Sequence, residues 1–164
     1  MKNKIIIIII SIIIVLAAVI FFNLNENPEE QQINSHQKLS SSEILALNLI
    51  LDGEYKIQAI SWKVIDNFGR LPLFLEISQQ QNIELIKLIY NRNNLSIPKD
   101  NWIINIENFN STKRACSAGL DQENRNLGIY NEFYSRLKDK DVINLFNIIR
   151  QVSEENIIKF QRCD

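Results

Sequence analysis

Residues 116–137, CSAGLDQENRNLGIYNEFYSRL, carry the pattern that decides the fold. Their apolar and aromatic side chains recur at steps of three, four and seven, which places them on one face of an α-helix. This stripe consists of Cys116, Leu120, Leu127, Tyr130, Tyr134 and Leu137. The spacing therefore predicts an amphipathic helix from about residue 112 to residue 137.

A second amphipathic helix is predicted directly after the charged turn 138–140, from about Asp141 to Arg162. Its stripe consists of Val142, Leu145, Phe146, Ile149, Val152, Phe160 and Cys163. Because the turn is short, the two helices should form an antiparallel hairpin.

The first half of the region repeats this plan. One of the serines at 40–42 can cap a helix that begins near Glu43, and Gly69 ends it. Pro72 then starts a second helix that we expect to continue to about Asn93. The stripes of these two helices consist of Leu47, Leu51, Ile57, Val64, Ile65 and Phe68, and of Leu75, Ile86 and Ile89.

The connection between the two predicted hairpins, residues 94–111, is long. Fully extended it reaches about 60 Å, whereas a helix of this size is only about 35 Å long. It can therefore cross the whole bundle, and we expect Pro98, Trp102 and Phe109 to hold it there. The predicted fold is all-α, a four-helix bundle of two antiparallel hairpins joined by one long crossover.

Residues 5–22, IIIIIISIIIVLAAVIFF, form an apolar run interrupted only by Ser11. As a helix the run spans roughly 27 Å, close to the hydrocarbon thickness of a bilayer. Lys2 and Lys4 precede it, so the positive-inside rule places the N-terminus in the cytoplasm. The run is expected to be a single-pass anchor in the cytoplasmic membrane. A cleaved signal peptide, which would make the protein secreted, is the alternative. Both interpretations place the domain outside the cytoplasm.

The predicted organisation is therefore an anchor at 1–22, a flexible polar linker at 23–41 and the bundle at 42–164. The only histidine, His36, lies in the linker. The formal net charge of −1, without a basic patch, argues against nucleic acid as a partner.

The two cysteines lie where the last hairpin should bring them together. Cys116 opens one helix and Cys163 closes the next, and these ends are neighbours in an antiparallel pair. Because a location outside the cytoplasm permits oxidation, we expect a disulfide between them. Two free buried thiols are the alternative.

Polar residues fall in phase with the apolar stripes of all four helices. Glu54 and Glu123 lie mid-stripe in the first and third helices. Gln79 and Asn82 hold this position in the second helix, with Glu84 as an alternative two residues on. In the fourth helix the corresponding residues are Ser153 and Asn156, with Glu154 and Ile157 as alternatives.

Several stretches resemble a ferritin-like domain of unknown function found in bacteria and archaea. They are DGEYKIQA (52–59), QQNIELI (80–86), IPKDNW (97–102), ACSAGLDQE (115–123), LGIYNEFYSRL (127–137) and SEEN with FQRC (153–163). The resemblance implies that both cysteines recur. It also implies that Glu54 and Glu123 are the single glutamates of a di-metal pattern whose other two helices carry Glu-x-x-His.

This sequence departs from that pattern, because neither register supplies a histidine. We therefore expect no redox cofactor, and a carboxylate–amide hydrogen-bond network that preserves the bundle. An oxygen-only site for Ca²⁺ or Mg²⁺ is the alternative.

Three hypotheses about function follow. The first is a membrane-anchored bundle without redox chemistry that has a binding or structural role. The second is a metal-dependent oxidoreductase or metal-handling enzyme, with iron or manganese at Glu54, Glu123 and either Glu84 or Glu154. The third is a helical interaction module whose protein partner docks on the aromatic side of the crossover.

Overall fold

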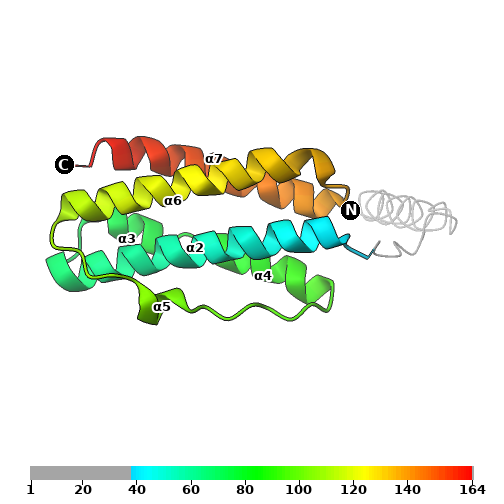
Figure 1. Ribbon diagram of the computed structural model, residues 1–164, viewed down its shortest axis with the longest axis horizontal. Coiled ribbons are helices and arrows are strands. Elements are labelled where there is room, and N and C mark those ends of the chain that lie inside the picture. Colours follow the sequence, from blue (N-terminus) through cyan, green and yellow to red (C-terminus); the bar gives the residue numbers. More distant parts are fainter. Residues whose placement is uncertain (1–37, 164) are drawn as a thin grey trace, which may run out of the picture. The chain divides into compact units, whose positions relative to one another are not determined.

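Residues 38–163 are those that the structure, a computed structural model, describes, and they form helices and loops without a strand (Figure 1). The helices are α2 (Ser41–Phe68), α3 (Pro72–Ser78), α4 (Asn82–Arg92), α5 (Trp102–Asn105), α6 (Thr112–Phe133), the 3-10 turn η2 (Tyr134–Arg136) and α7 (Lys140–Gln161). The predicted membrane anchor and most of the linker lie outside the described residues. None of the helices in this range is long and apolar enough to cross a membrane.

The helices pack as a bundle, which agrees with the all-α prediction. Helix α2 contacts α3, α4 and α6, while α7 contacts α6 and α4, so the contacts close a ring. Figure 1 shows α6 running antiparallel to both α2 and α7. The connection that contains α5 returns along α2, and α3 and α4 together occupy the fourth helix position.

The expected second helix is broken in two. Helix α3 ends at Ser78, whose hydroxyl donates to the carbonyl of Leu75 at 2.8 Å, and α4 begins only at Asn82. Such hydrogen bonds from serine compete with the helical backbone pattern, and no apolar residue occupies 79–82 to hold a continuous helix against the core. The prediction of one helix from Pro72 to Asn93 was therefore wrong.

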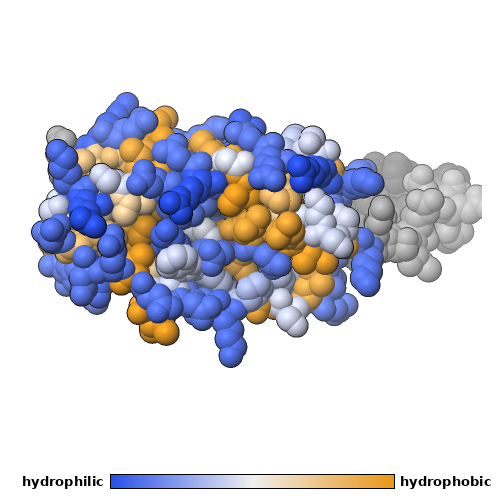
Figure 2. All heavy atoms as spheres, in the orientation of Figure 1, coloured by the Kyte–Doolittle hydropathy of each residue, from blue (hydrophilic) through white to orange (hydrophobic). Residues whose placement is uncertain are grey.

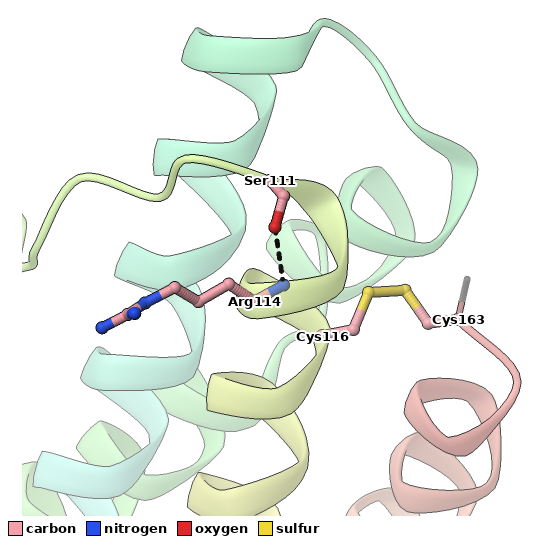
Figure 3. The surroundings of a disulfide bond; sticks show 4 residues. All are labelled: Ser111, Arg114, Cys116 and Cys163. Carbon is pink, nitrogen blue, oxygen red and sulfur yellow. Dashed lines mark hydrogen bonds between the residues drawn. A yellow bond between two sulfur atoms is a disulfide. The ribbon is translucent and has the colours of Figure 1, made fainter.

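Short polar residues fix the ends of the long helices. Ser40 and Glu43 form a capping box at the start of α2. Ser111 accepts a hydrogen bond from the backbone N–H of Arg114 at 3.2 Å at the start of α6 (Figure 3). Helix α2 ends at Gly69, whose φ of 87° is readily adopted only by glycine.

The last hairpin is clamped by the predicted disulfide. Cys116 in the first turns of α6 is bonded to Cys163 just beyond α7, with 6.0 Å between their Cα atoms (Figure 3). On the chain-entropy model a loop of this length contributes about 4 kcal/mol to stability.

The crossover is held against the bundle by the three residues that the sequence indicated. The Trp102 indole Nε1–H donates to Asp52 at 2.9 Å, and the Tyr55 hydroxyl donates to the backbone carbonyl of Pro98 at 3.4 Å. The side chain of Phe109 is buried in the core.

Two apolar clusters make up the core, and polar residues separate them. One cluster includes Leu47, Tyr90 and Phe146, and the other includes Ile60 and Phe160. Along α2, α6 and α7, and at the break between α3 and α4, the boundary between the clusters is occupied by buried polar side chains. We call these residues the polar layer: Glu54, Asn82, Glu123, Asn126, Ser153 and Asn156.

Candidate functional site

Two carboxylates lie at the centre of the polar layer. Glu54 of α2 and Glu123 of α6 are only 4% and 1% exposed. Between them lies the fully buried Asn126, whose Nδ2 is 3.4 Å from Oε1 of Glu54 and 3.5 Å from Oε2 of Glu123. One amide group thus bridges the two acids.

The other oxygen of each carboxylate accepts a hydrogen bond from a second asparagine. Nδ2 of Asn82 donates to Oε2 of Glu54 at 2.9 Å, and Nδ2 of Asn156 donates to Oε1 of Glu123 at 2.7 Å. All four carboxylate oxygens therefore face amide N–H donors.

Two glutamines extend this network toward the surface. Gln80 and Asn156 exchange a pair of hydrogen bonds at 2.9 and 3.1 Å, and Nε2 of Gln122 donates to Oδ1 of Asn126 at 2.9 Å. The carboxylates are thus connected to two sides of the bundle, through α6 and through the break between α3 and α4.

Gly53 makes room for the bridging asparagine. A Cβ atom at this position would collide with the side-chain amide of Asn126, and it would lie 3.0 Å from Nε2 of Gln122. The absence of a side chain on this face of α2 therefore lets the polar side chains of α6 lie directly against the neighbouring helix.

The electrostatics of the pair favour retention of a proton. Burial and then the nearby charge of Glu123 raise the pKa of Glu54 to about 8, against the opposing hydrogen bond from Asn82. Burial also raises the pKa of Glu123, although the hydrogen bond from Asn156, the nearby hydroxyl of Ser153 and the hydrogen bond from Asn126 act in the other direction. At neutral pH the pair should therefore hold at least one proton.

Two buried hydroxyls adjoin the carboxylates without a hydrogen bond of good geometry. They are Oγ of Ser153 and the hydroxyl of Tyr130. Burial and then the charge of Glu54 raise the pKa of Tyr130 well above its usual value, whereas the Ser153 hydroxyl acts to lower the pKa values of Tyr130 and Glu123. These hydroxyls add groups that can accept or donate a hydrogen bond in the layer.

Three of the residues predicted for the site lie outside it. Gln79 is exposed in the break between α3 and α4, where Gln80 instead turns inward. Glu84 is exposed and pairs with Lys87, and Glu154 is exposed and pairs with Arg150. Gln80 faces inward in place of Gln79 because the helix is broken there. Glu84 and Glu154 lie on the solvent faces of their helices.

Asn126 and Gln122 were missed because the buried face of α6 is rotated from the predicted stripe. Leu120 and Leu127 are only half-buried, and Tyr134 is 41% exposed. The signal in the sequence was a second series at three- and four-residue steps: Ala115, Gly119, Gln122, Asn126, Tyr130 and Phe133, all buried. Its polar and small members made it look like a solvent face.

The donors of the layer differ from those of a transition-metal centre. Carboxylate, amide and hydroxyl groups are present, and no group of three or more His, Cys, Asp or Glu side chains within 38–163 could hold a metal ion. Imidazole ligands would have to come from His36, which lies outside the described residues.

A third buried carboxylate, Glu43, lies at the end of the bundle and was predicted only as the start of a helix. It accepts hydrogen bonds from the N–H groups of Lys138 and Asp139 at 2.8 and 2.7 Å, and from Ser40. Burial raises its pKa, but the hydrogen bonds from Asp139, Lys138 and Ser40 outweigh burial and lower it to about 2. Glu43 therefore ties the start of α2 to the loop between α6 and α7.

Comparison with protein-family models, with curated proteins and with solved structures finds no match to this chain.

Proposed function

We propose that this protein is a membrane-anchored, extracytoplasmic bundle of the ferritin-like type with a binding or structural role. In this proposal a buried carboxylate pair, Glu54 with Glu123, that retains a proton stands where such bundles hold a redox metal centre. The apolar run at residues 5–22 would provide the anchor.

The proposal depends on one observation, the direction of the amide groups. Asn82, Asn126 and Asn156 present N–H donors to every oxygen of Glu54 and Glu123. A metal ion requires lone pairs directed at it, so these donors occupy the positions from which the carboxylates would bind a cation. They satisfy the buried acids without one.

The arrangement of the helices gives further support. Two hairpins with one long crossover are typical of ferritin-like bundles. Asn82 and Asn156 lie on the two helix positions from which that resemblance expects imidazole ligands. Amide groups there preserve the hydrogen bonding of the interior and lack the imidazole nitrogen that suits iron.

The test is a comparison of the full chain in detergent micelles with its Glu54→Gln and Glu123→Gln variants. We expect substoichiometric iron and manganese after reconstitution, and an infrared carbonyl band of a protonated carboxyl group that the two substitutions together remove. Glu84→Gln, which changes an exposed carboxylate, is the matched control and should leave this band unchanged.

Stoichiometric iron or manganese that is lost with Glu54→Gln would overturn the proposal in favour of an oxidoreductase. If Ca²⁺ or Mg²⁺ raised the melting temperature of the wild type but not of these variants, the layer would instead be a site for a hard cation.

A specific observation also favours the interaction module as a second candidate. The side chains of Ile103 and Ile104 in α5 are 65% and 82% exposed. Figure 2 shows hydrophobic spheres protruding at the place where Figure 1 has α5. Two adjacent exposed isoleucines on α5 give another protein an apolar surface to contact.

This candidate predicts that Ile104→Ser removes a specific partner captured from membranes by the full chain. Ile148→Ser is the control, because Ile148 is an exposed isoleucine, 51% exposed, that lies on α7. Equal capture by wild type and both variants would exclude α5 as the contact surface.

A further inference from the structure

A cavity of about 290 Å³ lies beneath the crossover, where residues of α5 and the segment after it face α2 and α6. Ile60 and Phe109 give it an apolar lining. Its charged residues are Lys56, Glu107, Asp121 and Arg125, of which Glu107 pairs with Arg114 at 3.6 Å. Sites for small ligands combine an apolar lining with a few charged or polar groups in this way. The volume is at the lower end of the range for such sites, about 300 Å³ and upward.

Two of these charges are positioned to pair with each other but do not. Asp121 precedes Arg125 by four residues on α6, the spacing and order at which opposite charges pair on a helix. Neither residue takes part in an ion pair within 38–163, whereas Arg150 and Glu154 at the same spacing on α7 are 3.0 Å apart. An anion and a cation therefore remain available at the cavity.

A second cation lies on the opposite wall. Nζ of Lys56 on α2 lies 4.7 Å from the centre of the Trp102 ring, and the indole is held in place by its hydrogen bond to Asp52. Lys56 makes no ion pair with any other residue that the structure describes. The cavity thus has cations on both α2 and α6.

Gln122 supplies a polar atom from the interior side. It is 6% exposed, lines the cavity, and uses Nε2 to donate to Asn126. No hydrogen bond from residues 38–163 reaches its Oε1. This carbonyl oxygen can accept from a cationic group, as can the neighbouring carboxylate of Asp121.

We propose that this cavity binds a small zwitterion, an α-amino acid or short peptide, with its carboxylate at Lys56 and Arg125 and its ammonium at Asp121 and Gln122. The apolar lining would receive the side chain of the ligand. The inference does not depend on the proposed function, because it uses charges outside the polar layer.

The test uses the full chain in detergent micelles with Trp62→Phe, which leaves Trp102 as the only tryptophan. Titration with L-leucine should give a saturable change in tryptophan fluorescence. Asp121→Asn and Arg125→Gln should each weaken binding about tenfold or more, since each removes a charge-assisted hydrogen bond. Leucinamide and N-acetyl-leucine, which each lack one of the two charges, should be weakened similarly.

Arg150→Gln on α7 is the matched control and should bind leucine as the parent does. The proposal is wrong if leucine, phenylalanine and dileucine all give no saturable response. It is also wrong if the two singly charged analogues bind as tightly as leucine. The analogue comparison needs no substitution in the cavity, so it remains decisive if a variant folds poorly.

Discussion

Helix α2 buries two glutamates of equal exposure in opposite electrostatic environments. Glu43 is 3% exposed and Glu54 is 4% exposed, yet the pKa of the first is lowered to about 2 and that of the second is raised to about 8. Burial raises the pKa of both. The difference comes from the greater depth of Glu54 in the bundle, from the charge of Glu123 beside it, and from the donors that each carboxylate meets.

The donors differ in kind as well as in number. Glu43 accepts from the backbone N–H groups of Lys138, Asp139 and Ser40 and from the Ser40 hydroxyl, at 2.7 to 2.8 Å. Glu54 instead accepts from the side-chain amides of Asn82 and Asn126, the second at 3.4 Å, and lies near a second acid, Glu123. One carboxylate is thus stabilised as an anion, whereas burial and the neighbouring acid favour a retained proton at the other.

The largest effect on stability should follow from removing the carboxylate of Glu43, which is fully hydrogen-bonded as an anion. Glu43→Ala leaves the N–H groups of Lys138 and Asp139 without their acceptor and removes the capping box of α2. We expect a loss of about 3–5 kcal/mol in the free energy of unfolding at pH 7, measured by urea denaturation.

Glu84→Ala is the control for this prediction, because it removes an exposed glutamate of α4 that pairs only with Lys87. Its cost should be about 0.5 kcal/mol or less. Similar costs for the two variants would mean that the hydrogen bonds of Glu43 contribute no more than those of a surface ion pair.

The second prediction concerns the pH dependence of stability, to which the two glutamates contribute in different pH ranges and with opposite sign. For Glu43 the folded pKa lies below the unfolded value of about 4.5, so its stabilisation is present above pH 4.5 and is lost as the pH falls toward 2. For Glu54 the folded pKa lies above the unfolded value, so its contribution is complete below pH 4.5 and is lost as the pH rises through 8.

The wild type should therefore lose on the order of 3–4 kcal/mol between pH 5 and pH 8. Glu54→Gln removes the titrating group, so its unfolding free energy should change much less over this range. Urea denaturation at several pH values measures both. A profile that Glu54→Gln leaves unchanged would show that Glu54 is not the group that takes up the proton.

The contrast between the two glutamates also shows what the sequence can reveal. Glu54 and Glu123 were predictable as inward residues because their place in the three- and four-residue spacing depends only on nearby positions. The role of Glu43 was not, because its partners lie 95 and 96 residues away in the α6–α7 loop. An acidic residue in the first turn of a helix is common for local reasons alone.

The helices were predictable from their periodicity, but the phase of α6 was not. The predicted buried face was drawn through Leu120 and Leu127, whereas the observed buried face runs through Gly119, Gln122 and Asn126. This face is buried because Gly53 on α2 accommodates the amides and Gly119 accommodates the ring of Phe160. Complementarity between two helices cannot be seen in the pattern of either one.

The smallest predicted effect tests that complementarity directly. Gly53→Ala places a methyl group against the amide of Asn126, which must shift away from Glu54 and Glu123 or push α6 outward. The steric cost of about 1–3 kcal/mol is partly offset by the better helix propensity of alanine, about 0.5–1 kcal/mol. We expect a net loss of about 1–2 kcal/mol in the free energy of unfolding.

Gly128→Ala is the matched control, because a Cβ at this exposed position of α6 meets no atom within 4 Å. It should stabilise the protein by about 0.5–1 kcal/mol through helix propensity alone. Opposite signs for the two glycines would show that Gly53 is needed for the contact between α2 and Asn126. If Gly53→Ala were as stabilising as Gly128→Ala, Asn126 could move freely, and the bridge between the carboxylates would contribute little to the bundle.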